Sequence, residues 1–245
     1  MNPLAFIGDL DDRCLVWLNG FMGRWPMFDR NLRHLLGNHE LKFGVLVAIF
    51  CWLWFRSSKD VQRDRRILIT TALASLGSLI LTRLLVLLLP FRERPFLRPD
   101  LHFVLPPGFE SDLRTWSAFP SDHAVMAFAL ATGFWMISRR LGALAFVHAL
   151  LCICAPRIYF GLHHPSDIVV GALIGVLSVV LSVRATRAGA FIARLLQQEQ
   201  RHSAMFYVIF FLFLQQTVVM FNGIRPVVAA AFSMLTRGCL VASSG

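Results

Sequence analysis

Charged residues are scarce in this chain of 245 residues: they make up 16% of the sequence, whereas hydrophobic residues make up 56%. The mean hydropathy is +0.62. A soluble domain usually carries about 25% charged residues, because its surface must be hydrated. The composition therefore excludes a soluble globular protein, and its apolar content excludes a low-complexity disordered chain. The sequence predicts an integral membrane protein.

Alternation of polar and apolar residues, which membrane-spanning strands require, is also missing. The apolar residues instead form continuous runs, and a helix needs about 20 such residues to cross a bilayer. Lys42 and other flanking cations would extend the shorter helices by reaching the interface. The six runs are residues 43–55, 67–91, 124–138, 141–156, 168–183 and 203–224. We therefore predict an all-α integral membrane protein with about six transmembrane helices in a compact bundle.

The two ends of the chain lack a full apolar run. Residues 1–35 mix aromatic side chains with acidic and basic ones, which is typical of a helix lying in the membrane interface. Acidic residues near the start do not fit a cleavable signal peptide. We predict an interfacial N-terminal segment at residues 1–35, a transmembrane core at 36–224 and a C-terminal tail at 225–245. The five cysteines show no spacing typical of a disulfide framework or a zinc site.

Positive charge exceeds negative charge by ten, with 24 Lys and Arg against 14 Asp and Glu. In a membrane chain such an excess indicates contact with lipid headgroups more often than nucleic-acid binding. Eleven of these cations fall in three loops on one side of the predicted bundle, at residues 56–66, 139–140 and 184–201. The positive-inside rule makes that side of a cytoplasmic membrane cytoplasmic. Residues 92–122 and 157–167 would then lie outside.

Unusual polar residues gather at this outer end, in three clusters at residues 92–95, 120–123 and 157–167. Considered separately, Ser121 would be a helix N-cap and the arginines would be headgroup anchors. Charged groups at membrane depth are costly, however, so their convergence indicates a functional site. Two histidines and a carboxylate could also ligate a metal. The adjacent arginines would repel a divalent cation and attract a phosphate, so we expect no metal.

The joint spacing of the clusters resembles the three-part signature of the type 2 phosphatidic acid phosphatase family, which is related to the vanadium-dependent haloperoxidases. That signature reads Lys-x6-Arg-Pro, Pro-Ser-Gly-His and Ser-Arg-x5-His-x3-Asp, and the matching motifs lie at residues 83–95, 120–123 and 157–167. Three positions depart from it: Leu87 stands at the lysine, Asp122 at the glycine and Pro156 at the serine. The Asp122 variant resembles that of bacterial undecaprenyl-diphosphate phosphatases.

The resemblance implies a phosphatase that hydrolyses a lipid mono- or diphosphate, with undecaprenyl diphosphate favoured, at the outer face of a bacterial membrane and without a cofactor. It implies His163 as the nucleophile that forms a phosphohistidine, Asp167 as the group that orients it and His123 as the general acid. The phosphate-binding residues would be Arg94, Ser121 and Arg157. Arg83 or Arg92 would replace the missing lysine, and Arg83 is favoured because a cation so deep in a span needs a partner.

Two alternatives stay open at this point. A lipid or sugar hydroxyl could receive the phosphoryl group from His163 instead of water, which would make the protein a lipid phosphotransferase. The missing lysine and the altered serine would also fit a non-catalytic lipid-phosphate carrier or scaffold, although such a protein needs no nucleophile. In each case the expected partners are a lipid phosphate and membrane lipids, with no nucleic acid. No feature of the sequence specifies an oligomeric state.

Overall fold

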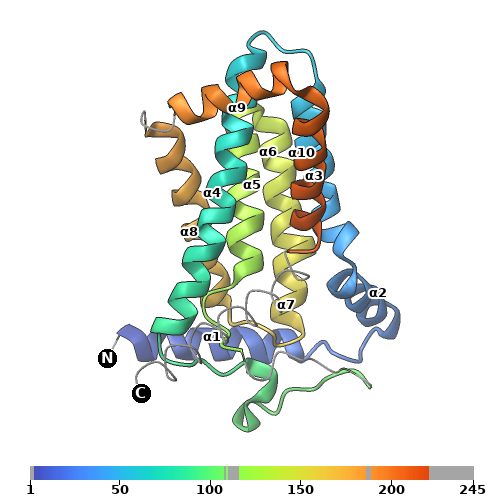
Figure 1. The fold of residues 1–245 in the computed structure, drawn as a ribbon. Coiled ribbons are helices and arrows are strands. Elements are labelled where there is room, and N and C mark those ends of the chain that lie inside the picture. The colour runs from blue at the N-terminus through green and yellow to red at the C-terminus, as the bar shows by residue number, and fades with distance from the viewer. Residues whose placement is uncertain (1–2, 108, 110–115, 186–188, 221–245) are drawn as a thin grey trace, which may run out of the picture.

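The computed structural model describes residues 3–107, 109, 116–185 and 189–220, and every regular element within these ranges is helical. The long helices run side by side as a bundle, and shorter helices cross its two ends (Figure 1). The predicted all-α architecture is therefore confirmed for the described residues. The predicted C-terminal tail, residues 225–245, lies outside them, as does the end of the sixth apolar run.

The bundle helices follow the apolar runs, because a helix within a membrane satisfies its backbone polar groups internally. They are α3 (Val45–Phe55), α4 (Val61–Leu88), α5 (Asp122–Ile137), α6 (Arg139–His148), α7 (Ala155–Tyr159), α8 (Pro165–Arg184) and α10 (Ser203–Val218). Two π-helical segments continue these helices: η1 (Glu40–Gly44) leads into α3, and η5 (Ala149–Cys154) joins α6 to α7. Two short 3₁₀ turns, η2 (Pro95–Leu97) and η3 (Pro99–Leu101), follow α4.

Three helical stretches are long and apolar enough to cross a membrane: residues 61–88, 139–159 and 165–184. The pair formed by α2 (Pro26–Gly37) and the η1–α3 helix would add a fourth if it acts as one span, although its two parts are bent by 76°. The helices α5 and α10 are apolar but shorter. By length and composition, the described helices contain three to four candidate spans.

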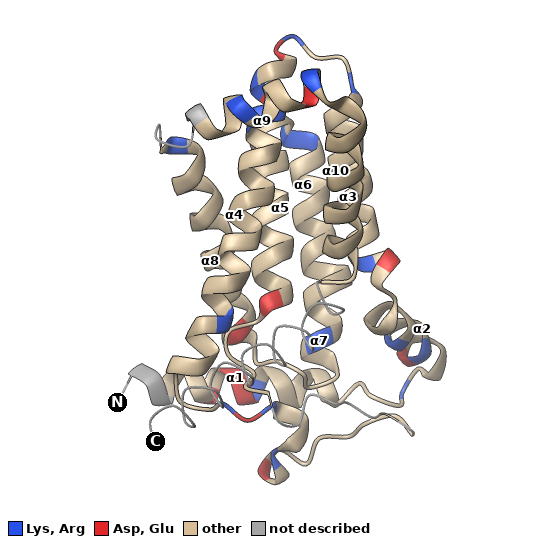
Figure 2. Ribbon diagram, viewed as in Figure 1, with Lys and Arg blue, Asp and Glu red and all other residues tan. Residues whose placement is uncertain are grey.

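The end of the bundle opposite α1 (Pro3–Asn19) carries α9 (Gly189–Arg201), which the apolar pattern did not predict. This amphipathic helix buries only one face, so charged and polar side chains alternate with its apolar ones. Residues 189–201 therefore form no continuous apolar run. Glu199 accepts hydrogen bonds from Arg65 Nη1 at 3.0 Å and from Tyr207 Oη at 2.8 Å, which joins α9 to α4 and α10. Lys and Arg residues collect around this end (Figure 2), in agreement with the predicted placement of the basic loops on one side.

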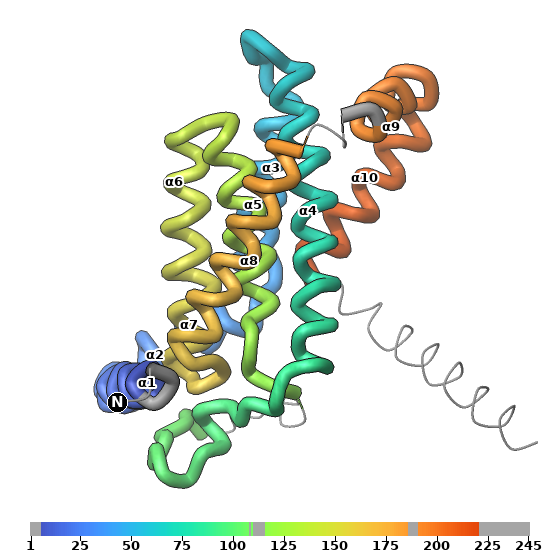
Figure 3. Tube along the Cα trace, turned by 90° about the vertical axis from the view of Figure 1, so that its left-hand side faces the viewer, coloured from blue at the N-terminus to red at the C-terminus, as the bar shows by residue number. Residues whose placement is uncertain are grey.

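The N-terminal segment contains two helices, whereas we predicted a single interfacial helix. The first, α1, lies across one end of the bundle (Figure 1, Figure 3) and contacts α7 and α8. Residues 20–25 separate it from α2, and Gly23 has a φ of +82°, which favours glycine. Asp29 of α2 is buried and accepts hydrogen bonds from Tyr159 Oη at 2.5 Å and from Gly23 N at 2.8 Å. A buried carboxylate thus fixes this segment to the bundle.

The helix α5 packs against α4, α6 and α8, and two glycines of α8 let that helix approach it closely. A Cβ atom at Gly171 would lie 2.6 Å from the backbone O of Ser121. A Cβ atom at Gly175 would lie 2.2 Å from the backbone O of Val125. This close approach brings the first turns of α5 and α8 together, where Ser121 N donates a hydrogen bond to Asp167 O at 3.2 Å.

We predict that Gly175→Ala lowers the thermal midpoint of the protein, because the added methyl group must displace the backbone of α5. Overpacking of this kind costs about 1–3 kcal/mol. Gly77→Ala in α4 is the matched control, since a Cβ atom there would meet nothing within 4 Å and alanine favours a helix by roughly 1 kcal/mol over glycine. Thermal unfolding in detergent should show opposite shifts for the two variants. A Gly175→Ala protein as stable as the wild type would contradict this account of the α5–α8 contact.

Candidate functional site

The three sequence clusters meet at the end of the bundle that α1 covers. The matching motif residues are Arg94, Ser121, His123, Arg157, His163 and Asp167, and all of them except His123 are buried. Arg94 Nη1 donates a hydrogen bond to Leu162 O at 2.6 Å, which places this arginine beside the turn that leads into α8. Figure 2 shows the charged residues gathered at the two ends of the bundle, with the helices between them nearly free of charge. The predicted convergence of the motifs is therefore present in the structure.

His163 lies in the turn before α8 and is held in one orientation. Its Nδ1 is 2.8 Å from the backbone O of Ala118. A carbonyl oxygen can only accept, so Nδ1 carries the hydrogen and the lone pair of the neutral ring lies on Nε2. Burial lowers the pKa of His163 below its usual value; Asp167 opposes this change, and the charge of Arg94 adds to it. The structure therefore favours the neutral imidazole, which is the form that can attack an electrophile.

Asp167 lies in the first turn of α8 and has more partners than the expected one. Its Oδ2 accepts a hydrogen bond from His164 N at 2.7 Å, whereas the distance from Oδ2 to His163 Nδ1 is 3.7 Å, too long for a hydrogen bond. Its Oδ1 forms an ion pair with Arg92 Nη1. The carboxylate thus stabilises the start of α8 and supplies negative charge beside His163. The carbonyl group of Ala118 makes the direct hydrogen bond that orients the ring.

Asp11 of α1 connects the N-terminal helix to this site, a role that the sequence did not indicate. It is buried, and its Oδ2 lies 2.8 Å from Arg92 Nη2. Its Oδ1 also accepts a hydrogen bond from Ser166 N at 2.9 Å, in the first turn of α8. Arg92 therefore bridges two carboxylates, Asp11 and Asp167. The signal in the sequence was a group of acidic residues, Asp9, Asp11 and Asp12, among the apolar residues of the N-terminal helix.

Two buried cations of the site have no carboxylate partner among the described residues: Arg157 and Lys42. Arg157 is 4% exposed, and its Nη1 donates to Ile153 O at 2.7 Å. Lys42 is 2% exposed, and its Nζ donates to Leu36 O at 2.5 Å. Lys42 also interacts electrostatically with Arg157 and with His123. We expected Lys42 to extend toward the membrane interface, but it is buried, just after the 76° bend between α2 and η1.

Ser121 precedes α5 and is fully buried. It occupies the N-cap position of α5, as interpreted from the sequence, but its side chain makes no capping hydrogen bond. Within the described part of the chain, its Oγ has no hydrogen-bond partner at all. A buried hydroxyl without a partner costs about 1–3 kcal/mol. The hydroxyl group of Ser121 is therefore available to a ligand.

The two arginines that we considered as replacements for the motif lysine are both paired with carboxylates. Arg92 pairs with Asp11 and Asp167, as described above, and Arg83 Nη2 forms an ion pair with Asp122 Oδ2. The guanidinium carbon of Arg83 also lies 5.5 Å from the centre of the Trp116 ring. The depth of Arg83 in α4 is thus explained by a carboxylate and an aromatic ring.

The site carries more positive than negative charge. Within the described ranges, five cations interact electrostatically with its histidines, its carboxylates or one another: Lys42, Arg83, Arg92, Arg94 and Arg157. Three carboxylates, Asp11, Asp122 and Asp167, oppose them. Among the described residues, no group of three or more His, Cys, Asp or Glu side chains is arranged to hold a metal ion. This arrangement can bind an anion, attack it with an imidazole and supply a proton.

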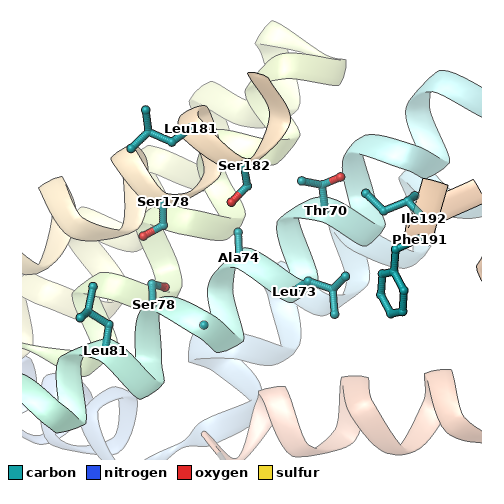
Figure 4. A pocket seen from close by; sticks show the side chains of 11 residues that line it. Thr70, Leu73, Ala74, Ser78, Leu81, Ser178, Leu181, Ser182, Phe191 and Ile192 are labelled. Atoms are coloured by element: carbon teal, nitrogen blue, oxygen red, sulfur yellow. The ribbon is translucent and has the colours of Figure 1, made fainter. Parts of the chain in front are cut away.

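A cavity of about 440 Å³ lies elsewhere, between α4, α8 and α9 (Figure 4). Its lining includes hydroxyl groups of α4 and α8, such as Ser78, Ser178 and Ser182, beside leucine side chains. None of the motif residues lines it. The cavity is therefore separate from the charged site.

Comparison with known proteins gives a family for the part of the chain that holds the motifs. Residues 71–190 match the sequence model of the PAP2 superfamily. This range includes every motif residue and Arg83, whereas Asp11 and Lys42 lie outside it. No solved structure matches the chain significantly.

Three curated relatives are similar over part of their length. The bacitracin transport permease protein BcrC of Bacillus licheniformis is 36% identical over 64 residues, which are 26% of this chain and 31% of the relative. The Escherichia coli (strain K12) protein YbjG, whose name provisionally gives it as an undecaprenyl-diphosphatase, is 30% identical over 133 residues, 54% of this chain and 61% of the relative. The undecaprenyl-diphosphatase BcrC of Bacillus subtilis (strain 168) is 26% identical over 130 residues, 53% of this chain and 60% of the relative. The chain thus spans about a third to three fifths of the length of these proteins.

We predict that inorganic phosphate stabilises the protein in the presence of a metal chelator. Phosphate at ten times its Kd contributes about 1.4 kcal/mol, which raises the thermal midpoint by roughly 3–6 °C in a chain of this size. Lys42→Met should reduce that shift. It should also raise the midpoint without phosphate, because it removes a buried charge that lacks an ion-pair partner.

Lys59→Met is the matched control for this measurement, since Lys59 is the other lysine of the chain and lies exposed in the loop before α4. It should leave both the midpoint and the phosphate shift unchanged. A phosphate shift that is the same in wild type and Lys42→Met would remove Lys42 from the anion site.

Proposed function

The chain belongs to the PAP2 superfamily through residues 71–190, and from this premise we propose that it is a membrane phosphatase that hydrolyses a lipid mono- or diphosphate through a phosphohistidine. One observation carries the proposal. His163 is buried with Nδ1 bound to the Ala118 carbonyl, so that the lone pair on Nε2 is available beside Arg94, which in turn interacts with the buried cation Arg157. A lipid-phosphate carrier would need the cations but not an imidazole held in the nucleophilic tautomer.

In the first step, Nε2 of His163 attacks the phosphorus atom and forms an N–P bond. The P–O bond to the leaving group breaks, and its electron pair goes to the leaving oxygen, which takes a proton from Nε2 of His123. As the N–P bond forms, the imidazole of His163 becomes positively charged. The nearby carboxylate of Asp167 and the carbonyl of Ala118 stabilise that charge.

In the second step, a water molecule attacks the phosphohistidine. A P–O bond forms, the N–P bond breaks and its electron pair returns to Nε2 of His163. His123, now neutral, accepts a proton from the water. Release of inorganic phosphate then leaves the enzyme ready for another substrate.

Negative charge on the phosphoryl oxygens is redistributed during both steps. The site must therefore bind these oxygens with positively charged groups and hydrogen-bond donors. We assign this role to Arg94, Arg157, Lys42 and the hydroxyl group of Ser121. Arg157 and Lys42 lack a carboxylate partner among the described residues, and Ser121 Oγ lacks any partner there. A phosphate group would supply the missing negative charge and the missing acceptor.

We further propose undecaprenyl diphosphate as the substrate and the outer side of a bacterial cytoplasmic membrane as the location of the site. The names of the Escherichia coli and Bacillus subtilis relatives support this substrate, as does the resemblance carried by Asp122. The proposed topology has six spans, formed by α3 with η1, α4, α5, the α6–η5–α7 helix, α8 and α10, with α1 at the outer interface. The basic loops at the opposite end of the bundle support this orientation.

We predict that purified protein releases inorganic phosphate from undecaprenyl diphosphate in detergent with a metal chelator present. His163→Ala should lose nearly all turnover while it keeps the thermal midpoint of the wild type, because it loses the nucleophile. His164→Ala is the matched control, as a second buried histidine in the same turn, and should retain most of the activity. A folded His163→Ala protein with substantial turnover would exclude the phosphohistidine. A panel that includes phosphatidic acid and phosphatidylglycerol phosphate identifies the preferred lipid.

We also predict a pH profile set by His163. Burial lowers the pKa of His163 below the usual 6.5, so the ring loses its proton at a lower pH than a solvated histidine. The value of kcat/KM should therefore rise with pH and reach its plateau through a midpoint below 6.5. It falls at lower pH, where the protonated ring has no lone pair. The measurement uses an aryl phosphate and is corrected for titration of the substrate, and a midpoint at or above 6.5 would contradict a buried nucleophile.

A further inference from the structure

Asp122, the residue that departs from the Pro-Ser-Gly-His pattern, contacts two functional side chains at once. Its Oδ1 lies 2.8 Å from His123 Nδ1 and also accepts a hydrogen bond from His123 N at 2.8 Å. Its Oδ2 forms an ion pair with Arg83 Nη2. The carboxylate therefore joins the C-terminal part of α4 to the histidine in the first turn of α5.

This contact fixes the proton arrangement of His123. A carboxylate can only accept, so Nδ1 of His123 carries a hydrogen and Nε2 is the atom that exchanges protons with a substrate or water. Arg157 and Lys42 both act electrostatically on His123, and positive charges oppose an imidazolium. Asp122 is the anion that opposes them, by direct contact with the ring.

We propose that Asp122 is a positioning residue for His123 and that Arg83 holds the Asp122 carboxylate in place, an inference that rests on the proposed phosphatase function. His123 and Asp122 then form a histidine–carboxylate pair on the leaving-group side of the phosphoryl centre. Arg83 does not contact the phosphate. The aromatic ring of Trp116 covers the guanidinium group of Arg83 and helps to fix its direction.

The proton balance follows from this arrangement. When the anionic phosphate is bound, its charge and that of Asp122 stabilise His123 as an imidazolium, with one hydrogen on Nδ1 directed at Asp122 and one on Nε2. The proton on Nε2 passes to the leaving oxygen, and Asp122 remains ionised throughout. In the second step Nε2 takes a proton from water, and the imidazolium is restored beside the same carboxylate.

The test compares Asp122→Asn with Arg83→Gln, because the two changes should move the pH profile in opposite directions. Asp122→Asn removes the charge that stabilises the imidazolium, so the alkaline limb of kcat should move to lower pH. Arg83→Gln removes a cation that competes for the same carboxylate, so the limb should move to higher pH. Phosphate release by the wild type is established first, and each variant is then made as a single change in that protein. The thermal midpoint of each variant shows whether it folds.

The dependence on the leaving group provides a second readout. General acid catalysis contributes about 10²–10⁴ in rate, and Asp122→Asn should lose part of this, roughly 10- to 100-fold, with a lipid phosphate. It should lose much less with an activated aryl phosphate, whose leaving group needs no proton. In a His123→Ala background, Asp122→Asn should have no further effect. Asp64→Asn is the matched control, since Asp64 is a buried carboxylate paired with Arg56 at the other end of α4.

Two results would overturn the inference while leaving the proposed function intact. One is an alkaline limb that neither Asp122→Asn nor Arg83→Gln moves, in proteins that fold and release phosphate. The other is an equal loss with lipid and aryl phosphates, which would make the ion pair a structural link between α4 and α5. If Asp122→Asn does not fold, Arg83→Gln and Arg83→Lys decide the question through the same limb. A wild type without phosphatase activity would instead refute the proposed function itself.

Discussion

Burying a cation inside a membrane bundle costs free energy unless an anion neutralises it. Two half-buried arginines near the site satisfy that requirement with carboxylates: Arg83 pairs with Asp122, and Arg92 pairs with Asp11 and Asp167. Arg157 and Lys42 do not, within the described residues. Both act electrostatically on His123, and Arg94 acts on His163. The site is thus built for an anion that arrives with the substrate.

The packing of α5 against α8 turns this electrostatic arrangement into a site of defined geometry. Gly171 and Gly175 let the two helices approach until the backbone of Ser121 contacts that of Asp167. The proposed nucleophile, before α8, and the proposed general acid, at the start of α5, are then held by rigid helix ends. The N-terminal helix α1 completes this end of the bundle, because Asp11 binds both Arg92 and the start of α8. Rigid placement of this kind lowers the entropic cost of reaching the transition state.

The helices and the motif residues could be predicted because both depend on local properties of the sequence. Apolar runs define helices such as α8, and the short spacing of His163 and Asp167 places them on adjacent turns. Lys42 could not be predicted in the same way, because it reaches Arg157 only through the bend between α2 and α3. The roles of Arg83 and Asp122 also depend on the contact between α4 and α5, which no spacing within the sequence specifies.

Some contacts within the site differ from those expected from the sequence, also because they depend on tertiary structure. The signature implied that Asp167 orients His163, whereas the closest hydrogen-bond partner of the ring is the backbone O of Ala118, 45 residues earlier in the chain. A backbone carbonyl leaves no trace in a residue pattern, because every amino acid supplies one. The amphipathic helix α9 was not predicted, because the charged residues on one face lower the average hydropathy of the segment although its other face is apolar. In each case the missing information was the tertiary contact.

A structure of the protein with orthovanadate and a metal chelator tests the account most directly, because vanadate reproduces the five-coordinate phosphoryl centre. The account predicts a bond from vanadium to Nε2 of His163. The vanadate oxygens should contact Arg157, Lys42 and Ser121 Oγ, and Nε2 of His123 should face the oxygen opposite His163. Vanadate bound without contact to His163, or bound through a metal ion between the histidines, would contradict it.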